Sequence, residues 1–175
     1  MKIFPNAKVQ TLKDCHPGQL VRGYGYSEDS DFGIVFDFDN GDIKKRGVIS
    51  LTKNGPEYSF DEEPDIAKVL AYGGELVFEA NQLQHCEGRA SSLYDQKGVL
   101  VGTAAGWSLN VQAEEQFDRR GRRAQLHLPS AMLSFGQDQA QGVGFFGSWS
   151  VYLEDEDRPV ERRVLIAKFT VKGEV

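Results

Sequence analysis

Two dipeptides, Cys15-His16 and His85-Cys86, carry the residue types of a zinc site or of a thiol nucleophile with its base. Tetrahedral zinc needs four ligands at about 2.0–2.3 Å. Neighbouring side chains of an extended chain point to opposite faces, so each dipeptide supplies one ligand rather than two. A nucleophile pair would join Cys15 to His85 or Cys86 to His16, and nothing in the surrounding sequence activates either thiol. The pattern therefore predicts buried cysteines and surface histidines, with no metal site and no catalytic residue.

Two further motifs match a functional pattern in letters but not in context. Gly142 to Gly147 reads G-x-G-x-x-G, yet a dinucleotide site requires a helix after the loop, and an alternating strand follows here. Asp37 to Asp42 begins like a calcium loop, but glycine stands at the fifth position instead of the sixth, and Val48 stands at the twelfth. The many carboxylates would permit hydrolysis by a pair of acids, although their spatial pairing does not follow from the chain. We expect no cofactor.

The concentrated positive charge of the chain is a run of four arginines within five residues: Arg119, Arg120, Arg122 and Arg123. Such a run can bind a phosphate or an acidic partner surface through bidentate contacts. The alternative is a solvated hairpin tip that the nearby carboxylates partly neutralise. Nucleic-acid binding would need stacking aromatic residues among the arginines, and only Phe117 is close. The net charge of −6 also argues against a basic face, so we expect no nucleic-acid partner.

Aromatic residues offer a second kind of candidate site. Trp107 and Trp149 each lie in a segment where apolar and polar residues alternate. With other aromatic residues they could line a ligand cavity, although aromatic side chains at period two are more often part of a core. The set that could line such a cavity is Trp107, Trp149, Tyr24, Tyr26, Phe145 and Phe146.

The elements that would position these residues read as strands. Gly33 to Leu51 forms two β-rich halves around Asn40-Gly41, which predicts a hairpin with a two-residue type I′ turn. Further alternating segments indicate strands with one wet face. They include residues 76–80, 107–112, 123–128 and 148–154, followed by a long final strand within 160–171.

One segment reads as a helix near residues 63–72. Asp61 to Glu63 places negative charge at the positive end of a helix, and Pro64 is tolerated in a first turn. Ile66, Val69 and Leu70 would then share one buried face. Gly73-Gly74 would end the helix, which at about two and a half turns would have to pack on a sheet.

Together these elements predict an all-β, mainly antiparallel fold. Turns recur at the spacing of a β-sandwich or β-barrel with about ten to twelve short strands and one short helix. We expect a single compact domain over residues 1–175, because its length suffices for one core. A weak sub-boundary near 72–74 would separate an acidic first part from a neutral second part.

Function follows only as a class. Met1 to Lys8 has no apolar run typical of a signal peptide, no stretch approaches the ~20 apolar residues of a membrane span, and two cysteines suit a reducing compartment, so we expect a cytoplasmic protein without membrane contact. The leading hypothesis is a noncatalytic binding or assembly module that presents loops to a protein partner, or to a second copy of the chain. The alternatives are a small-ligand-binding barrel with an aromatic-lined cavity and a hydrolase using carboxylates or a Cys-His pair.

Overall fold

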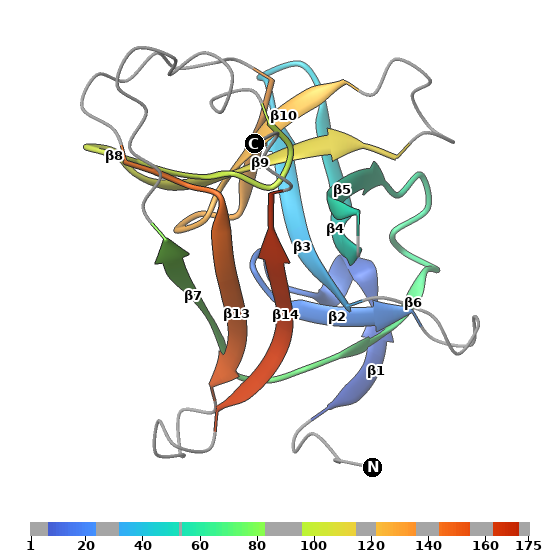
Figure 1. Cartoon of the computed structure of the whole chain (residues 1–175). Helices are drawn as coiled ribbons and strands as arrows, with labels where there is room; N and C mark the ends of the chain where they lie inside the picture. The colour runs from blue at the N-terminus through green and yellow to red at the C-terminus, as the bar shows by residue number, and fades with distance from the viewer. Residues whose placement is uncertain are drawn as a thin grey trace.

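Strands make up nearly all the regular structure of the protein. The computed structural model describes residues 7–23, 32–52, 54–82, 96–114, 122–135, 144–154 and 163–171, and Figure 1 shows its ribbon. These ranges hold fourteen strands and one short 3-10 helix, η1 (Leu12–Asp14). The strands are β1 (Lys8–Thr11), β2 (Leu20–Gly23), β3 (Phe32–Asp39), β4 (Lys44–Thr52), β5 (Gly55–Phe60), β6 (Lys68–Ala71), β7 (Glu75–Gln82), β8 (Leu100–Thr103), β9 (Gly106–Ala113), β10 (Arg123–His127), β11 (Met132–Ser134), β12 (Gly144–Phe146), β13 (Ser148–Glu154) and β14 (Val164–Thr170). The predicted all-β class is confirmed.

Six strands close into a barrel. The order around the ring is β3-β11-β10-β9-β5-β4, and β4 pairs with β3 again. Two short parallel contacts, β11 with β3 and β5 with β9, join antiparallel stretches that alone would stay open. The strands β2, β6 and β1 continue the sheet beside the first half of β3, and β8 and β12 continue it beside the first half of β9.

A second sheet of three strands packs against this barrel. Its order is β14-β13-β7, and Figure 1 shows it beside the barrel in red, orange and green. Trp149 of β13 is 1% exposed, belongs to the same apolar cluster as the barrel interior, and its indole N–H donates to the Gly98 carbonyl at 2.6 Å. Alternate residues of the strands are apolar and point to the same face of each sheet. Because these two apolar faces pack against each other, the two sheets share one core.

Side chains fill the barrel interior. Strands of the ring contribute a common cluster of buried residues, whose members include Ile34, Phe36, Ile49, Tyr58, Leu109, Val111, Leu126 and Leu133. A six-stranded ring is narrow enough for such side chains to occupy its centre. A second, smaller cluster lies on the outer face of β3, where η1, β2 and β6 cover Val35. Strand β3 is therefore buried on both faces over much of its length.

The hairpin predicted over residues 33–51 is confirmed, but its turn differs in detail. β3 pairs antiparallel with β4 from Gly33↔Ser50 to Asp39↔Lys44. The Asn40 amide donates to the Ile43 carbonyl, so Gly41 and Asp42 are the central residues. Only Gly41 among them has a positive φ, at 90°. The Asn40 side-chain oxygen accepts from the amides of Asp42 and Ile43, which moves the turn one residue beyond the predicted Asn-Gly centre.

The helix predicted near residues 63–72 is wrong. One helical turn does form, in which the Glu63 carbonyl accepts from the amides of Ile66 and Ala67. The chain then extends as β6, which pairs with both β1 and β2. Val69 and Ala71 are buried and Ile66 is 68% exposed, so burial follows period two rather than a helical stripe. Pairing on both edges of β6 replaces the hydrogen bonds that a short helix would have made.

Strands from both sides of residues 72–74 close the barrel. β3, β4 and β5 precede this point and β9, β10 and β11 follow it. The predicted single domain and its weak sub-boundary stay predictions. Across the described ranges, no helix has the length and apolar character needed to cross a membrane.

Candidate functional site

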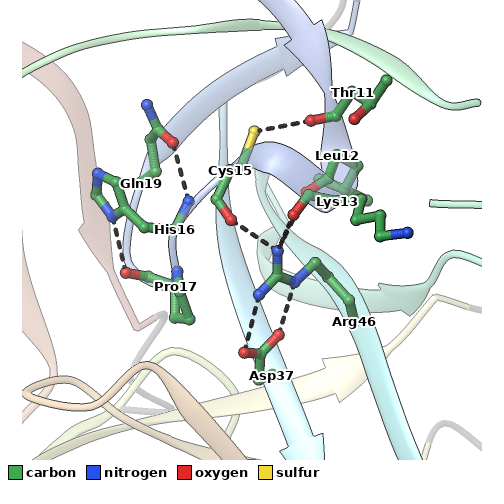
Figure 2. Close-up of polar contacts among 9 residues, drawn as sticks. All are labelled: Thr11, Leu12, Lys13, Cys15, His16, Pro17, Gln19, Asp37 and Arg46. Atoms are coloured by element: carbon green, nitrogen blue, oxygen red, sulfur yellow. Dashed lines mark hydrogen bonds and ion pairs between the residues drawn. The ribbon is translucent and has the colours of Figure 1, made fainter. Parts of the chain in front are cut away.

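Cys15 lies just after η1, in the cluster on the outer face of β3 (Figure 2). The side chain is 2% exposed. Its sulfur accepts from the Gln10 amide at 3.1 Å, and the thiol faces the Thr11 carbonyl at 3.5 Å. Burial raises the pKa of the Cys15 thiol, although the Gln10 hydrogen bond and the Arg46 charge oppose that shift. The thiolate that a nucleophile or a zinc ligand requires is therefore disfavoured.

Arg46 holds the same region together. It lies directly opposite Asp37 on the antiparallel pair β3–β4 and binds both carboxylate oxygens, at 2.7 and 3.0 Å. Its remaining guanidinium nitrogen donates to the carbonyls of Lys13 and Cys15 at 2.6 and 2.7 Å (Figure 2). The hydrogen bonds that Arg46 donates to the Asp37 carboxylate raise the pKa of Arg46 above its ordinary value. Through these hydrogen bonds the Arg46 guanidinium holds η1 against the barrel, so this polar cluster has a structural role.

The predicted surface histidine is confirmed at position 16. His16 is exposed, and its Nδ1 lies 3.1 Å from the Pro17 carbonyl, directed away from Cys15 (Figure 2). His85 and Cys86 lie outside the described residues, so the Cys15–His85 pairing stays untested. Within the part of the chain that the structure describes, no three His, Cys, Asp or Glu residues gather as metal ligands would.

A histidine–serine pair was not predicted from the sequence. His127 Nδ1 lies 2.7 Å from the Ser130 hydroxyl, and Nε2 lies 3.4 Å from the Ala105 carbonyl of the β8–β9 turn. The two residues are three positions apart in one turn, where hydroxyl hydrogen bonds commonly fix local geometry. Ala131 follows with a positive φ of 50°, as such a tight reversal requires. We interpret the pair as a brace between two turns.

The barrel topology gathers several strand ends at one place. The β3–β4 turn, the end of β5, the end of β9, the start of β10 and the end of β11 all lie at the same end of the ring. This follows from the register pairs Asp39↔Lys44, Gly47↔Phe60, Tyr58↔Ala113, Arg123↔Gln112 and Gln125↔Ser134. Arg122 and Arg123 of the predicted arginine run lie at the start of β10 and therefore belong to this end.

Aromatic rings and cations alternate at this end, which we call the aromatic barrel end and define by Phe38, Lys45, Phe60, Arg122 and Phe135. The ring centroids of Phe38 and Phe60 lie 5.8 Å apart, and those of Phe38 and Phe135 lie 5.1 Å apart. Lys45 lies over the Phe60 ring at 5.3 Å, and Arg122 lies over the Phe135 ring at 5.7 Å. Phe135 remains 37% exposed. Rings and cations at these distances attract each other through the ring quadrupole.

Two of the four predicted arginines are seen at the rim of this end. Arg122 and Arg123 are exposed at the start of β10, while Arg119 and Arg120 lie outside the described residues. Exposed carboxylates share the rim: Lys44 pairs with Asp39 at 3.2 Å, and Asp42 lies in the neighbouring turn. The surface of the aromatic barrel end thus carries charges of both signs at its rim and aromatic side chains between them.

The two predicted tryptophans separate in the structure. Trp149 is a core residue that contacts Phe78 and Phe169, whereas Trp107 is 43% exposed and packs at a tilt against Phe146 at the other end of β9. Phe145 packs against a different cluster. Tyr24 and Tyr26 lie outside the described residues. These aromatic residues do not form one cavity within the described barrel, whose centre is filled.

Sequence reasoning found the arginines of the barrel end but missed its aromatic partners. Phe38 lies in β3, Phe60 ends β5 and Phe135 directly follows β11, so the three are distant in sequence and their spacing carries no common pattern. Only the closure of the ring brings them together. The nearest local sign was the placement of Phe60 and Phe38 at strand ends, which is too common to be informative.

Comparison of the chain with models of known protein families, with curated proteins and with solved structures found no match. The functional argument therefore rests on the geometry alone.

Proposed function

We propose that the protein is a noncatalytic binding module whose aromatic barrel end contacts an acidic surface of a protein partner. The observation that carries this proposal is Arg122 lying over the half-exposed ring of Phe135, at the end where the connections of the barrel converge. Arginine and aromatic residues are enriched at protein interfaces, whereas lysine, aspartate and glutamate are depleted in the centre of an interface.

Exposed apolar residues strengthen the case for a protein partner. Besides Phe135, Ile43 in the β3–β4 turn is 47% exposed at the same end of the barrel. Cations at the rim, among them Lys45, Arg122 and Arg123, would favour an acidic partner and raise its association rate. A second copy of the chain is a weaker candidate, because two chains that each carry a net charge of −6 repel each other.

The hydrolase alternative lacks support in the described residues. The Cys15 thiol is buried with a raised pKa, and the His16 ring faces a backbone carbonyl instead of the sulfur.

Affinity capture with matched variants tests the proposal. We expect the wild-type protein to capture a partner that is lost when Arg119, Arg120, Arg122 and Arg123 are all replaced by Ser, and also lost in Phe135→Ser. The control is Trp107→Leu. Trp107 lies six residues before Ala113, the last residue of β9, and is therefore about 20 Å from the aromatic barrel end at the rise of a strand. This variant should retain the partner. A partner kept by both barrel-end variants, or lost equally in the control, would contradict the proposal.

A further inference from the structure

An apolar pocket of about 390 Å³ lies between the two sheets, away from the aromatic barrel end. Phe78 and Ala80 of β7 line one side, and Leu100 and Trp107 of the β8–β9 hairpin line another. Pro129, after β10, also lines it. Every described residue that lines the pocket has an apolar side chain. Phe78 packs directly on the core residue Trp149, so the core supports this side of the pocket.

Trp107 forms a flat wall of this pocket. It lies opposite Gly102 on the β8–β9 pair, and Gly102 in turn lies opposite Gly144 on β12. A methyl group at Gly102 would come within 3.1 Å of the indole carbons, so the ring rests closely over the glycine backbone. The Phe146 ring holds it from the side, with 5.2 Å between centroids. The glycines thus leave a strip on which the indole can lie.

Hydrogen bonds fix the adjoining wall. The Leu128 amide donates to the Trp107 carbonyl at 2.9 Å, which ties the chain after β10 to β9. The His127 ring bridges the Ser130 hydroxyl and the Ala105 carbonyl. It thereby joins the β10–β11 turn, which contains Pro129, to the β8–β9 turn. A pocket held in this way loses little freedom when a ligand binds.

We propose that this pocket binds a small, uncharged ligand with a planar ring, stacked on the indole of Trp107. Its volume lies in the range of small-molecule sites, roughly 300–1,000 Å³. A charged ligand would lose its hydration without gaining a charged partner in the lining, so the lining selects an uncharged one. The flat indole and the nearby Phe78 ring favour a planar aromatic group over a puckered ring of equal size.

Three probes of matched carbon skeleton test the ligand class: 2-naphthol is planar and uncharged, decahydro-2-naphthol is puckered, and 2-naphthoate is planar and charged. The chain has two tryptophans, so isotope-labelled protein gives two indole N–H signals in a nitrogen–proton correlation spectrum. We expect 2-naphthol to shift the Trp107 signal in a saturable way and to leave the Trp149 signal in place. The other two probes should bind about tenfold more weakly or worse.

Trp107→Leu keeps an apolar side chain while removing the flat wall, and it should weaken 2-naphthol binding about tenfold, measured by calorimetry. An unchanged Trp149 signal checks that this variant is folded. Phe135→Ser, at the aromatic barrel end, is the matched control and should bind as the wild type does. The proposal is overturned if 2-naphthol does not bind, if decahydro-2-naphthol or 2-naphthoate binds equally well, or if the two variants behave alike.

Discussion

At the scale of single residues, the polar side chains that attracted attention by type are used for structure. Arg46 is 21% exposed as a side chain, pairs with Asp37 through two hydrogen bonds, and also donates to carbonyls around η1. Cys15 is covered by the same small element. The dipeptide Cys15-His16 could not reveal this, because Arg46, which donates to the Cys15 carbonyl, lies 31 positions further along the chain.

Replacing Arg46 by Ala should lower the free energy of unfolding by about 2–3 kcal/mol, since it leaves a partly buried carboxylate and several carbonyls without their donor. Urea denaturation measures this loss. The control is Lys44→Ala, which removes an exposed ion pair with Asp39 and should cost less than about 1 kcal/mol. Equal losses in the two variants would contradict the structural role of Arg46.

Burial of Cys15 predicts a pH dependence of stability. The folded-state pKa of the thiol is raised above its ordinary value of 9.0, so the folded state holds this proton more tightly than the unfolded state. The resulting stabilisation is complete below about pH 9 and falls as the pH rises through the folded-state pKa. Urea titrations from pH 8 to 10.5, in a Cys86→Ser background, should therefore show a decline that Cys15→Ala flattens. Identical profiles for the two proteins would show that the thiol is not buried as described.

At the scale of elements, the sequence predicted those strands in which apolar and polar residues alternate, because this alternation indicates one buried face and one solvent-exposed face. The strands at 107–112, 123–128 and 148–154 were recognised in this way and are observed as β9, β10 and β13. The short strand β6 was missed, because acidic residues, Pro64 and a partial helical stripe outweighed four residues of alternation. Its pairing with β1 and β2 is a tertiary effect, and no local propensity reports it.

The β3–β4 hairpin offers a prediction at this scale through two of its glycines, Gly41 and Gly47. A methyl group at Gly47 would overlap the Ser59 carbonyl and the Phe36 ring, whereas at Gly41 it would meet nothing within 4 Å. Gly47→Ala should therefore destabilise the protein by about 3 kcal/mol through overpacking. Gly41→Ala should cost only about 1 kcal/mol, from its positive φ of 90°. Thermal melting compares the two, and a larger loss at Gly41 would refute the packing at Gly47.

At the scale of the whole molecule, the pairing and packing of strands distant in sequence create the candidate sites. The aromatic barrel end depends on β3, β5, β10 and β11 meeting, and the Trp107 pocket depends on the second sheet lying beside β8 and β9. The sequence predicted an all-β fold and the β3–β4 hairpin, but not which distant strands pair, because the order of strands around a barrel leaves no periodic pattern in the sequence. Arg122, Arg123 and Trp107 were therefore identified one by one, and their surroundings were not.

The central claim is that the aromatic barrel end binds an acidic protein surface, and the association rate with the captured partner tests it most directly. For the wild type, the rate should fall steeply as salt rises from 50 to 500 mM, because salt screens the attraction between rim cations and partner carboxylates. The variant with Ser at positions 119, 120, 122 and 123 should associate more slowly at low salt, with a shallower dependence, while its stability stays within about 1 kcal/mol of the wild type. Superimposable salt dependences for the two proteins would contradict the account.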